Sequence, residues 1–224
     1  MPAIGNTPLI KLERLPGPGS ADVYVKYEGA NPTGSMKDRM ALSMIEGAER
    51  RGELAAGGTV VEYTGGSTGS SLAMVCAMKG YGAHFVSSDA FSKEKLQTMQ
   101  ALGARLELIP SENGHITAKL FDLMVARVRE LSKRPNTFWT NQFNNADNRS
   151  AYHAMAGEIM AVSDEDAVET ARKLARIEGV FGGTSSGANV WAALQRARKI
   201  GPGKKIVTIV CDSGLKYLNG DLYK

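Results

Sequence analysis

A lysine at the start of a predicted helix is the most reactive group in this sequence. Residues 31–39 place Lys37 in the first turn of a helix predicted over residues 36–51. Unpaired backbone N–H groups and the positive helix end lie there, and they lower a lysine pKa and free the amine for a Schiff base. Lys37 is therefore a candidate anchor for pyridoxal phosphate. Most lysines are only solvated surface charges, so the segment gains its meaning from the motifs around it.

Two loops rich in glycine and hydroxyl residues lie at predicted junctions between a strand and a helix. The first covers residues 64–70, after a strand over 59–63, and the second covers residues 182–187, between an apolar strand and a helix. Glycines let backbone N–H groups approach a carboxylate or phosphate, and hydroxyls add donors at the helix N-terminus. Each loop alone is equally compatible with an ordinary turn capped by serine.

Alternating strands and helices must position these loops. Strands are predicted over residues 23–25, 59–63, 84–86, 105–109 and 206–210, and helices over residues 36–51, 67–78, 92–102, 116–133, 148–160 and 186–200. Ser163 and Asp166 form a capping box that predicts one more helix start. This alternation predicts right-handed βαβ units and a parallel sheet, and therefore an α/β fold.

Composition limits the class of protein and its ligands. The chain has 224 residues, 43% hydrophobic and 22% charged, which is typical of one or two globular domains. The net charge of +4 comes from scattered lysines and arginines, so we expect a small anionic ligand and no nucleic acid. Since no apolar run reaches membrane-spanning length, we expect no membrane association and a cytoplasmic protein.

Histidines and cysteines do not form a metal-binding pattern. His84, His115 and His153 have no ligand spacing with each other or with the two cysteines, Cys76 and Cys211. We therefore expect no metal site. The cysteines are far apart, and the apolar surroundings of Cys76 predict a buried thiol, so nothing indicates an oxidising compartment.

Taken together, the motifs resemble the cysteine synthase group of fold-type II pyridoxal phosphate (PLP) enzymes, which includes O-acetylserine sulfhydrylases and cystathionine β-synthases. The matching segments, in the family's order, are residues 5–9, 31–39, 64–69, 142–143, 183–187 and 214–218. The resemblance implies a two-domain fold similar to that of the tryptophan synthase β subunit. It implies a smaller movable domain over residues 35–145 and a larger PLP-binding domain over residues 1–34 and 146–224.

The same resemblance implies roles toward the cofactor. Lys37 would hold PLP as a Schiff base and would take and return the Cα proton. Ser185 would hydrogen-bond the pyridine nitrogen, and a neutral hydroxyl there suits β-elimination better than transamination because it does not stabilise a protonated ring. Ser67 stands where the family usually has an asparagine that contacts the PLP 3′-oxygen. A serine reaches less far, so this contact would change or be bridged by water.

The implied substrate is a small amino acid. Thr64, Gly65, Thr68 and Gln142 would hold its carboxylate and so orient the Cα–H bond. The implied reaction is β-replacement, which forms cysteine from O-acetylserine or a related activated serine and sulfide through an aminoacrylate, in a homodimer. Two alternatives stay open: another β-elimination or β-replacement such as cystathionine formation, and a degenerate protein that binds an amino acid or a partner without catalysis.

One departure from the family is large. Between Met160 and Ala161 the family has a segment of sub-domain size, which carries sheet strands and the Gly/Thr-rich loop for the PLP phosphate. No Gly-Thr-Gly-Gly-Thr sequence occurs in the 224 residues. Either the sequence joins two parts of a longer protein or the segment is deleted. We expect the former, since a deletion that exposes so much apolar sheet surface should fold poorly.

Overall fold

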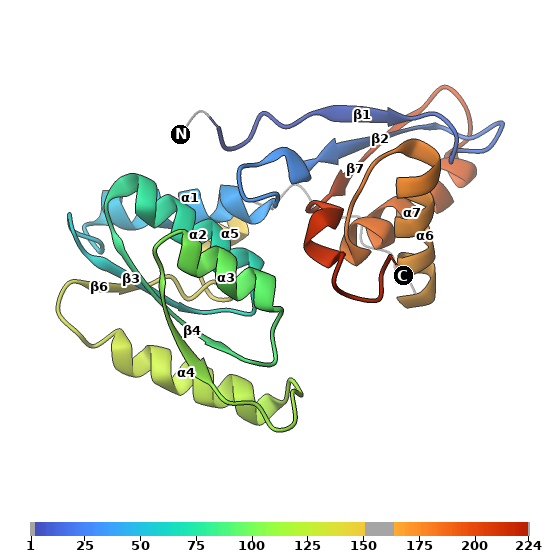
Figure 1. The fold of residues 1–224 in the computed structure, drawn as a ribbon. Coiled ribbons are helices and arrows are strands. Elements are labelled where there is room, and N and C mark those ends of the chain that lie inside the picture. The colour runs from blue at the N-terminus through green and yellow to red at the C-terminus, as the bar shows by residue number, and fades with distance from the viewer. Residues whose placement is uncertain (1–2, 151–163, 224) are drawn as a thin grey trace. The chain divides into compact units, whose positions relative to one another are not determined.

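The computed structural model describes residues 3–150 and 164–223. The chain divides into two compact units, Met1–Met36 with Ala154–Lys224 and Lys37–His153 (Figure 1). Each unit has its own β-sheet and its own helices, and the architecture is mixed α/β, as predicted. None of the helices in the described ranges is long and apolar enough to cross a membrane.

The unit Lys37–His153 is built on a parallel sheet of strand order β5-β4-β3-β6. Its strands are β3 (Thr59–Tyr63), β4 (Gly82–Ser88), β5 (Arg105–Ile109) and β6 (Thr137–Trp139). Its helices are α1 (Lys37–Arg51), α2 (Ser67–Lys79), α3 (Lys93–Ala101), α4 (Ala118–Leu131) and α5 (Ala146–Ser150). Because the strands are parallel, the loops that follow them meet at one edge of the sheet, where α/β proteins bind ligands.

Helices cover both faces of this sheet (Figure 1). On one face Val61 and Val86 pack against α4 through Met124 and Val128. On the other face the helices α1 and α2 pack together, and α2 is buried along most of its length. This burial agrees with the small and apolar residues that make up most of α2, and it holds the first turn of α2 at the sheet edge.

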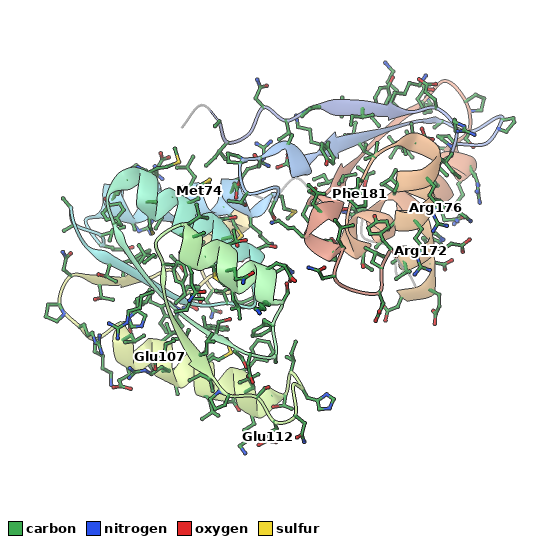
Figure 2. All side chains as sticks on the ribbon, in the orientation of Figure 1. Met74, Glu107, Glu112, Arg172, Arg176 and Phe181 are labelled. Atoms are coloured by element: carbon green, nitrogen blue, oxygen red, sulfur yellow. The ribbon has the colours of Figure 1, made fainter. Side chains whose placement is uncertain are left out.

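The other unit has a three-stranded sheet of order β1-β2-β7, formed by β1 (Leu9–Leu12), β2 (Asp22–Tyr27) and β7 (Lys205–Val210). The strand β2 runs antiparallel to β1 and parallel to β7. Two helices, α6 (Asp164–Glu178) and α7 (Thr184–Ile200), bury their apolar faces against it. Two 3₁₀ turns, η1 (Glu28–Ala30) and η2 (Gly214–Tyr217), complete it. Arg172 of α6, labelled in Figure 2, donates to the carbonyls of Asp221 and Leu222 and so fixes the C-terminal segment.

Some sequence-based predictions are corrected by the structure. The strand expected before residues 182–187 is wrong: a single bridge joins Gly182 to Ser213, because few residues separate Gly179, with a φ of 69°, from the helix N-cap at Gly183. The helix that follows starts at Thr184 rather than at Ser186. The strands β1 and β6 were not predicted. Residues 151–160 of the helix predicted over 148–160 lie outside the described residues, and so does the cap Ser163.

Candidate active site

Lys37 lies in the first turn of α1, as predicted, and is its first residue; its side chain is half-buried. The next residue, Asp38, is fully buried and accepts a hydrogen bond of 2.5 Å from the hydroxyl of Ser71 in α2. The start of the lysine helix is thus joined to the helix that follows the glycine-rich loop. Since α1 and α2 belong to the same compact unit and pack together, Lys37 and this loop have a common support.

The residues just before Lys37 belong to the other unit and are tied to its C-terminal part. The N–H of Met36 donates to the carbonyl of Cys211 at 2.8 Å, and the N–H of Ser213 donates to the carbonyl of Gly34 at 3.0 Å. The N–H of Cys211 in turn donates to the hydroxyl of Ser186 at 3.0 Å. These bonds connect the approach to Lys37 with the first turn of α7.

A buried polar network gives a physical reason for the motifs at residues 5–9 and 31–39. Asn31 donates to Glu28 Oε2 at 2.7 Å, and Thr7 donates to Glu28 Oε1 at 2.7 Å. The N–H of Gly5 donates to Asn31 Oδ1 at 2.9 Å. Thr7, Glu28 and Asn31 are all buried, so the network fixes the chain that leads into the lysine helix.

The loop between β3 and α2 presents unpartnered backbone donors. Thr64 shapes it, because the Thr64 hydroxyl accepts from the N–H groups of Gly66 and Gly69 at 3.1 and 3.2 Å. No partner among the described residues is found for the N–H groups of Gly65, Ser67 and Thr68. Together with the helix dipole, these donors form a site for a carboxylate or another small anion.

Two predicted site residues meet directly at this loop. The hydroxyl of Thr68 donates to Gln142 Oε1 at 2.8 Å, and Gln142 Nε2 donates to the carbonyl of Tyr63 at 3.1 Å. Both residues are buried. Because Nε2 carries two protons and one is used, Gln142 keeps one N–H for a further acceptor.

Glu62 supports this arrangement, and the sequence analysis did not single it out. Its carboxylate is fully buried and accepts from the Thr140 hydroxyl at 2.5 Å, from the N–H of Gln142 at 3.0 Å and from the N–H of Tyr63 at 2.8 Å. The indole N–H of Trp139 donates to it at 3.4 Å. Burial raises the pKa of Glu62, and these hydrogen bonds oppose the rise.

Ser185 belongs to the other unit, at the second position of α7. Its side chain is exposed, and the N–H groups of Thr184 and Ser185 have no partner in the part of the chain that the structure describes. Gly183 packs so closely on Tyr217 that an added Cβ would lie 2.3 Å from the ring. The Tyr217 hydroxyl donates to Asp212 at 2.8 Å, and burial raises the pKa of this phenol.

Ser67 is the first residue of α2 and is half-buried. Its hydroxyl has no hydrogen-bond partner among residues 3–150 and 164–223. It is therefore available to a ligand, although it is shorter than the asparagine of the family.

Each unit, taken by itself, presents a group of the type that the sequence analysis assigned to PLP. A lysine at a helix start suits a covalent link to the aldehyde, and an exposed hydroxyl at the start of α7 suits a pyridine nitrogen. For a phosphate, no loop in the described ranges has the predicted Gly/Thr-rich sequence. No group of three metal-binding side chains occurs in the same ranges.

Comparisons with known proteins show which family the chain matches. A family model described as "Pyridoxal-phosphate dependent enzyme" matches residues 1–161 and 152–212. Cysteine synthase B of Salmonella typhimurium is 33% identical over 292 aligned residues, which span 98% of this chain and 94% of the relative. A cysteine synthase of Staphylococcus aureus is 30% identical over 300, with 98% and 95% covered.

Solved structures give the same result for the fold. An O-ureido-L-serine synthase is 28% identical with a TM-score of 0.85, covering 99% of this chain and 93% of that one. A hydrogen sulfide-producing enzyme of Fusobacterium nucleatum is 29% identical with a TM-score of 0.84, covering 97% and 98%. A cysteine synthase of Entamoeba histolytica, at 24% identity and a TM-score of 0.86, has the same fold.

The sequence alignments are longer than this chain, which has 224 residues, so they include positions where this chain has none. The two segments matched by the family model overlap at residues 152–161. The junction expected between Met160 and Ala161 lies outside the described residues, and its nature stays a prediction.

Proposed function

Because the chain belongs to the pyridoxal-phosphate dependent enzyme family, we propose that it forms cysteine by β-replacement on O-acetylserine or a related activated serine, with sulfide as the nucleophile. Relatives named cysteine synthase at 33% and 30% identity support this reaction. One observation carries the proposal. The unpartnered N–H groups of Gly65, Ser67 and Thr68 lie beside the Thr68–Gln142 pair, in the same unit as Lys37.

The loop after β3 binds the substrate carboxylate in this proposal. Three backbone N–H groups and the remaining N–H of Gln142 offer enough donors for both carboxylate oxygens, while the Thr68 hydroxyl holds Gln142 in place. Their supports are buried, so little reorganisation is needed when the substrate arrives. A fixed carboxylate orients the Cα–H bond for removal.

Lys37 holds the cofactor through its amine and then moves the Cα proton at Nζ. PLP, when bound, supplies the electron-withdrawing ring that makes this proton removable. The Ser185 hydroxyl contacts the ring nitrogen without adding a charge, which favours loss of a β-substituent over transamination. Ser67 contributes a shorter contact than the family's asparagine.

The finer features of the sequence-based hypothesis belong to the same proposal. The domain over residues 35–145 closes onto the substrate through the glycine-rich loop. The enzyme is a cytoplasmic homodimer. The division of the chain near Lys37 supports the movable domain. The cysteines show no pattern that indicates an oxidising compartment, which supports a cytoplasmic location.

The test is a product assay on the full chain with PLP. We expect O-acetylserine and sulfide to give cysteine, with faster turnover than serine and homocysteine give cystathionine. The solved relative named as a hydrogen sulfide-producing enzyme favours a second candidate, release of sulfide from cysteine, which a parallel assay with cysteine as the substrate and no added sulfide measures. Cofactor binding without turnover of any of these substrates would contradict the proposal.

Lysines at two helix starts provide a matched control for this assay. Lys93 is the first residue of α3, as Lys37 is of α1, but its side chain is exposed and no motif surrounds it. Lys93→Ala should therefore retain full cysteine formation. Equal losses in Lys93→Ala and Lys37→Ala would contradict the assignment of the reaction to Lys37.

A further inference from the structure

We propose that Glu62 is a positioning residue, which holds Gln142 against Thr68 and thereby sets the affinity for the amino-acid substrate. The inference rests on the proposed function, in which the loop over residues 64–68 binds the substrate carboxylate. Glu62 itself acts through Gln142.

The contacts of Glu62 join the ends of two neighbouring strands. The ladder between β3 and β6 ends at the pair Val61–Trp139, one residue before Glu62. Beyond that pair the Glu62 carboxylate bonds to residues that follow both strands. Its Oε2 accepts from the hydroxyl of Thr140 and the N–H of Gln142. Its Oε1 accepts from the N–H of Tyr63 and the indole N–H of Trp139. Glu62 therefore binds three of the residues in the range 139–142.

The turn that Glu62 fixes has an uncommon backbone conformation. Asn141 has a φ of 45°, in the left-handed region that residues other than glycine and asparagine seldom adopt. Glu62 Oε2 binds the residues on both sides of it, Thr140 and Gln142. Such a conformation persists when its surroundings determine it. Here Glu62 Oε2 binds the turn from one side, and the amides of Asn145 and Asn148 donate to the carbonyls of Thr140 and Gln142.

A role in strand packing alone does not account for this residue. Glu62 is fully buried, and no cation is bonded to it among the described residues. Burying a carboxylate without a cation is costly, and an apolar residue would pack a strand of the core at lower cost. The specific gain is the direction of Gln142, whose side chain reaches the Thr68 hydroxyl and the Tyr63 carbonyl.

The experiment compares Glu62→Gln with Glu62→Asp, and uses Glu107→Gln as a control. Glu107, labelled in Figure 2, is a half-buried glutamate that pairs with Arg127. It belongs to β5, the edge strand opposite β6 in the sheet order. We expect Glu62→Gln to raise the KM for the amino acid about tenfold, with kcat changed less than about twofold. Glu62→Asp should restore part of the loss. Glu107→Gln should leave KM unchanged.

A double-mutant cycle separates a positioning role from a structural one. If Glu62 acts through Gln142, Glu62→Gln should change KM less than about twofold in the Gln142→Ala background. Independent effects that multiply would overturn the inference, as would an equal fall of kcat and kcat/KM. A Gln142→Ala variant with unchanged KM would instead contradict the proposed carboxylate site.

A second measurement needs neither cofactor nor turnover. The N–H of Gln142 donates to Glu62, so its hydrogen exchange should be slow in the wild type and faster by about tenfold or more in Glu62→Gln. If Glu62→Gln does not fold, Thr140→Val, which removes one donor and keeps the carboxylate, should still raise KM and speed this exchange. Unchanged exchange at Gln142 would overturn the inference.

Discussion

The hydroxyl of Ser71 donates to Asp38 Oδ1 at 2.5 Å, and both side chains are fully buried between α1 and α2. Asp38 is the neighbour of Lys37, and Ser71 lies one turn into the helix that begins at the carboxylate loop. This buried hydrogen bond joins the two helix starts on which the proposed chemistry depends. Charge-assisted hydrogen bonds of this kind are stronger than neutral ones.

Removing this bond should destabilise the protein. We expect Ser71→Ala to lower the free energy of unfolding by about 1–3 kcal/mol, because a buried carboxylate loses a donor. Ser70→Ala is the control, since the Ser70 hydroxyl donates only to Gly66 of its own helix at 3.4 Å. Denaturant unfolding measures both. Similar losses in the two variants would contradict a special role for the Asp38 contact.

The Thr68 hydroxyl should matter for substrate binding. Thr68→Val keeps the side-chain shape but removes the donor to Gln142, so we expect the KM for the amino acid to rise about tenfold. Thr68→Ser, which keeps the hydroxyl, should stay close to wild type. Steady-state kinetics on both variants make the comparison, and a Thr68→Val enzyme with wild-type KM would argue against this carboxylate site.

Ser185 should control which reaction follows removal of the Cα proton. A carboxylate at this position stabilises a protonated ring nitrogen, so Ser185→Asp should raise the proportion of transamination products. Ser185→Thr, which keeps a hydroxyl, should not. Product ratios from the two variants provide the measurement. An unchanged ratio in Ser185→Asp would mean that Ser185 does not contact the ring nitrogen.

The buried thiol predicts a specific loss of stability in alkali. Burial raises the pKa of Cys76 from its ordinary value of 9.0 to about 12. The unfolded chain therefore releases the proton first, and stability present below about pH 9 is lost as the pH rises toward about 12. The free energy of unfolding should fall with pH more steeply in the wild type than in Cys76→Ala, by about 1.4 kcal/mol per pH unit. Parallel curves would contradict the raised pKa.

Local patterns explain which parts of the fold could be predicted from the sequence. The predicted bounds of β3 and β5 agree with the structure, and α1 and α2 differ from prediction by one residue at one end. The helix α4 starts at Ala118, two residues later than predicted, because the Thr117 hydroxyl caps it by accepting from the N–H of Leu120. These elements carry their own periodicity and caps.

The features that were not predicted depend on distant residues. The strand β6 has only three residues and exists because it pairs with β3, while β1 depends on pairing with β2. Glu62 looks like one polar residue in a strand, and its importance appears only when the end of β6 lies beside it. The position of Lys37 could be predicted, because a helix start and a motif are local properties.

The central claim is that Lys37 anchors PLP, and borohydride reduction tests it most directly. Reduction of the PLP-loaded wild type followed by peptide mass analysis should place the cofactor on Lys37. Lys37→Ala should lose the visible absorbance of the bound cofactor and all turnover, whereas Lys93→Ala should retain both. A reducible PLP adduct on another lysine in Lys37→Ala, with activity preserved, would contradict the account.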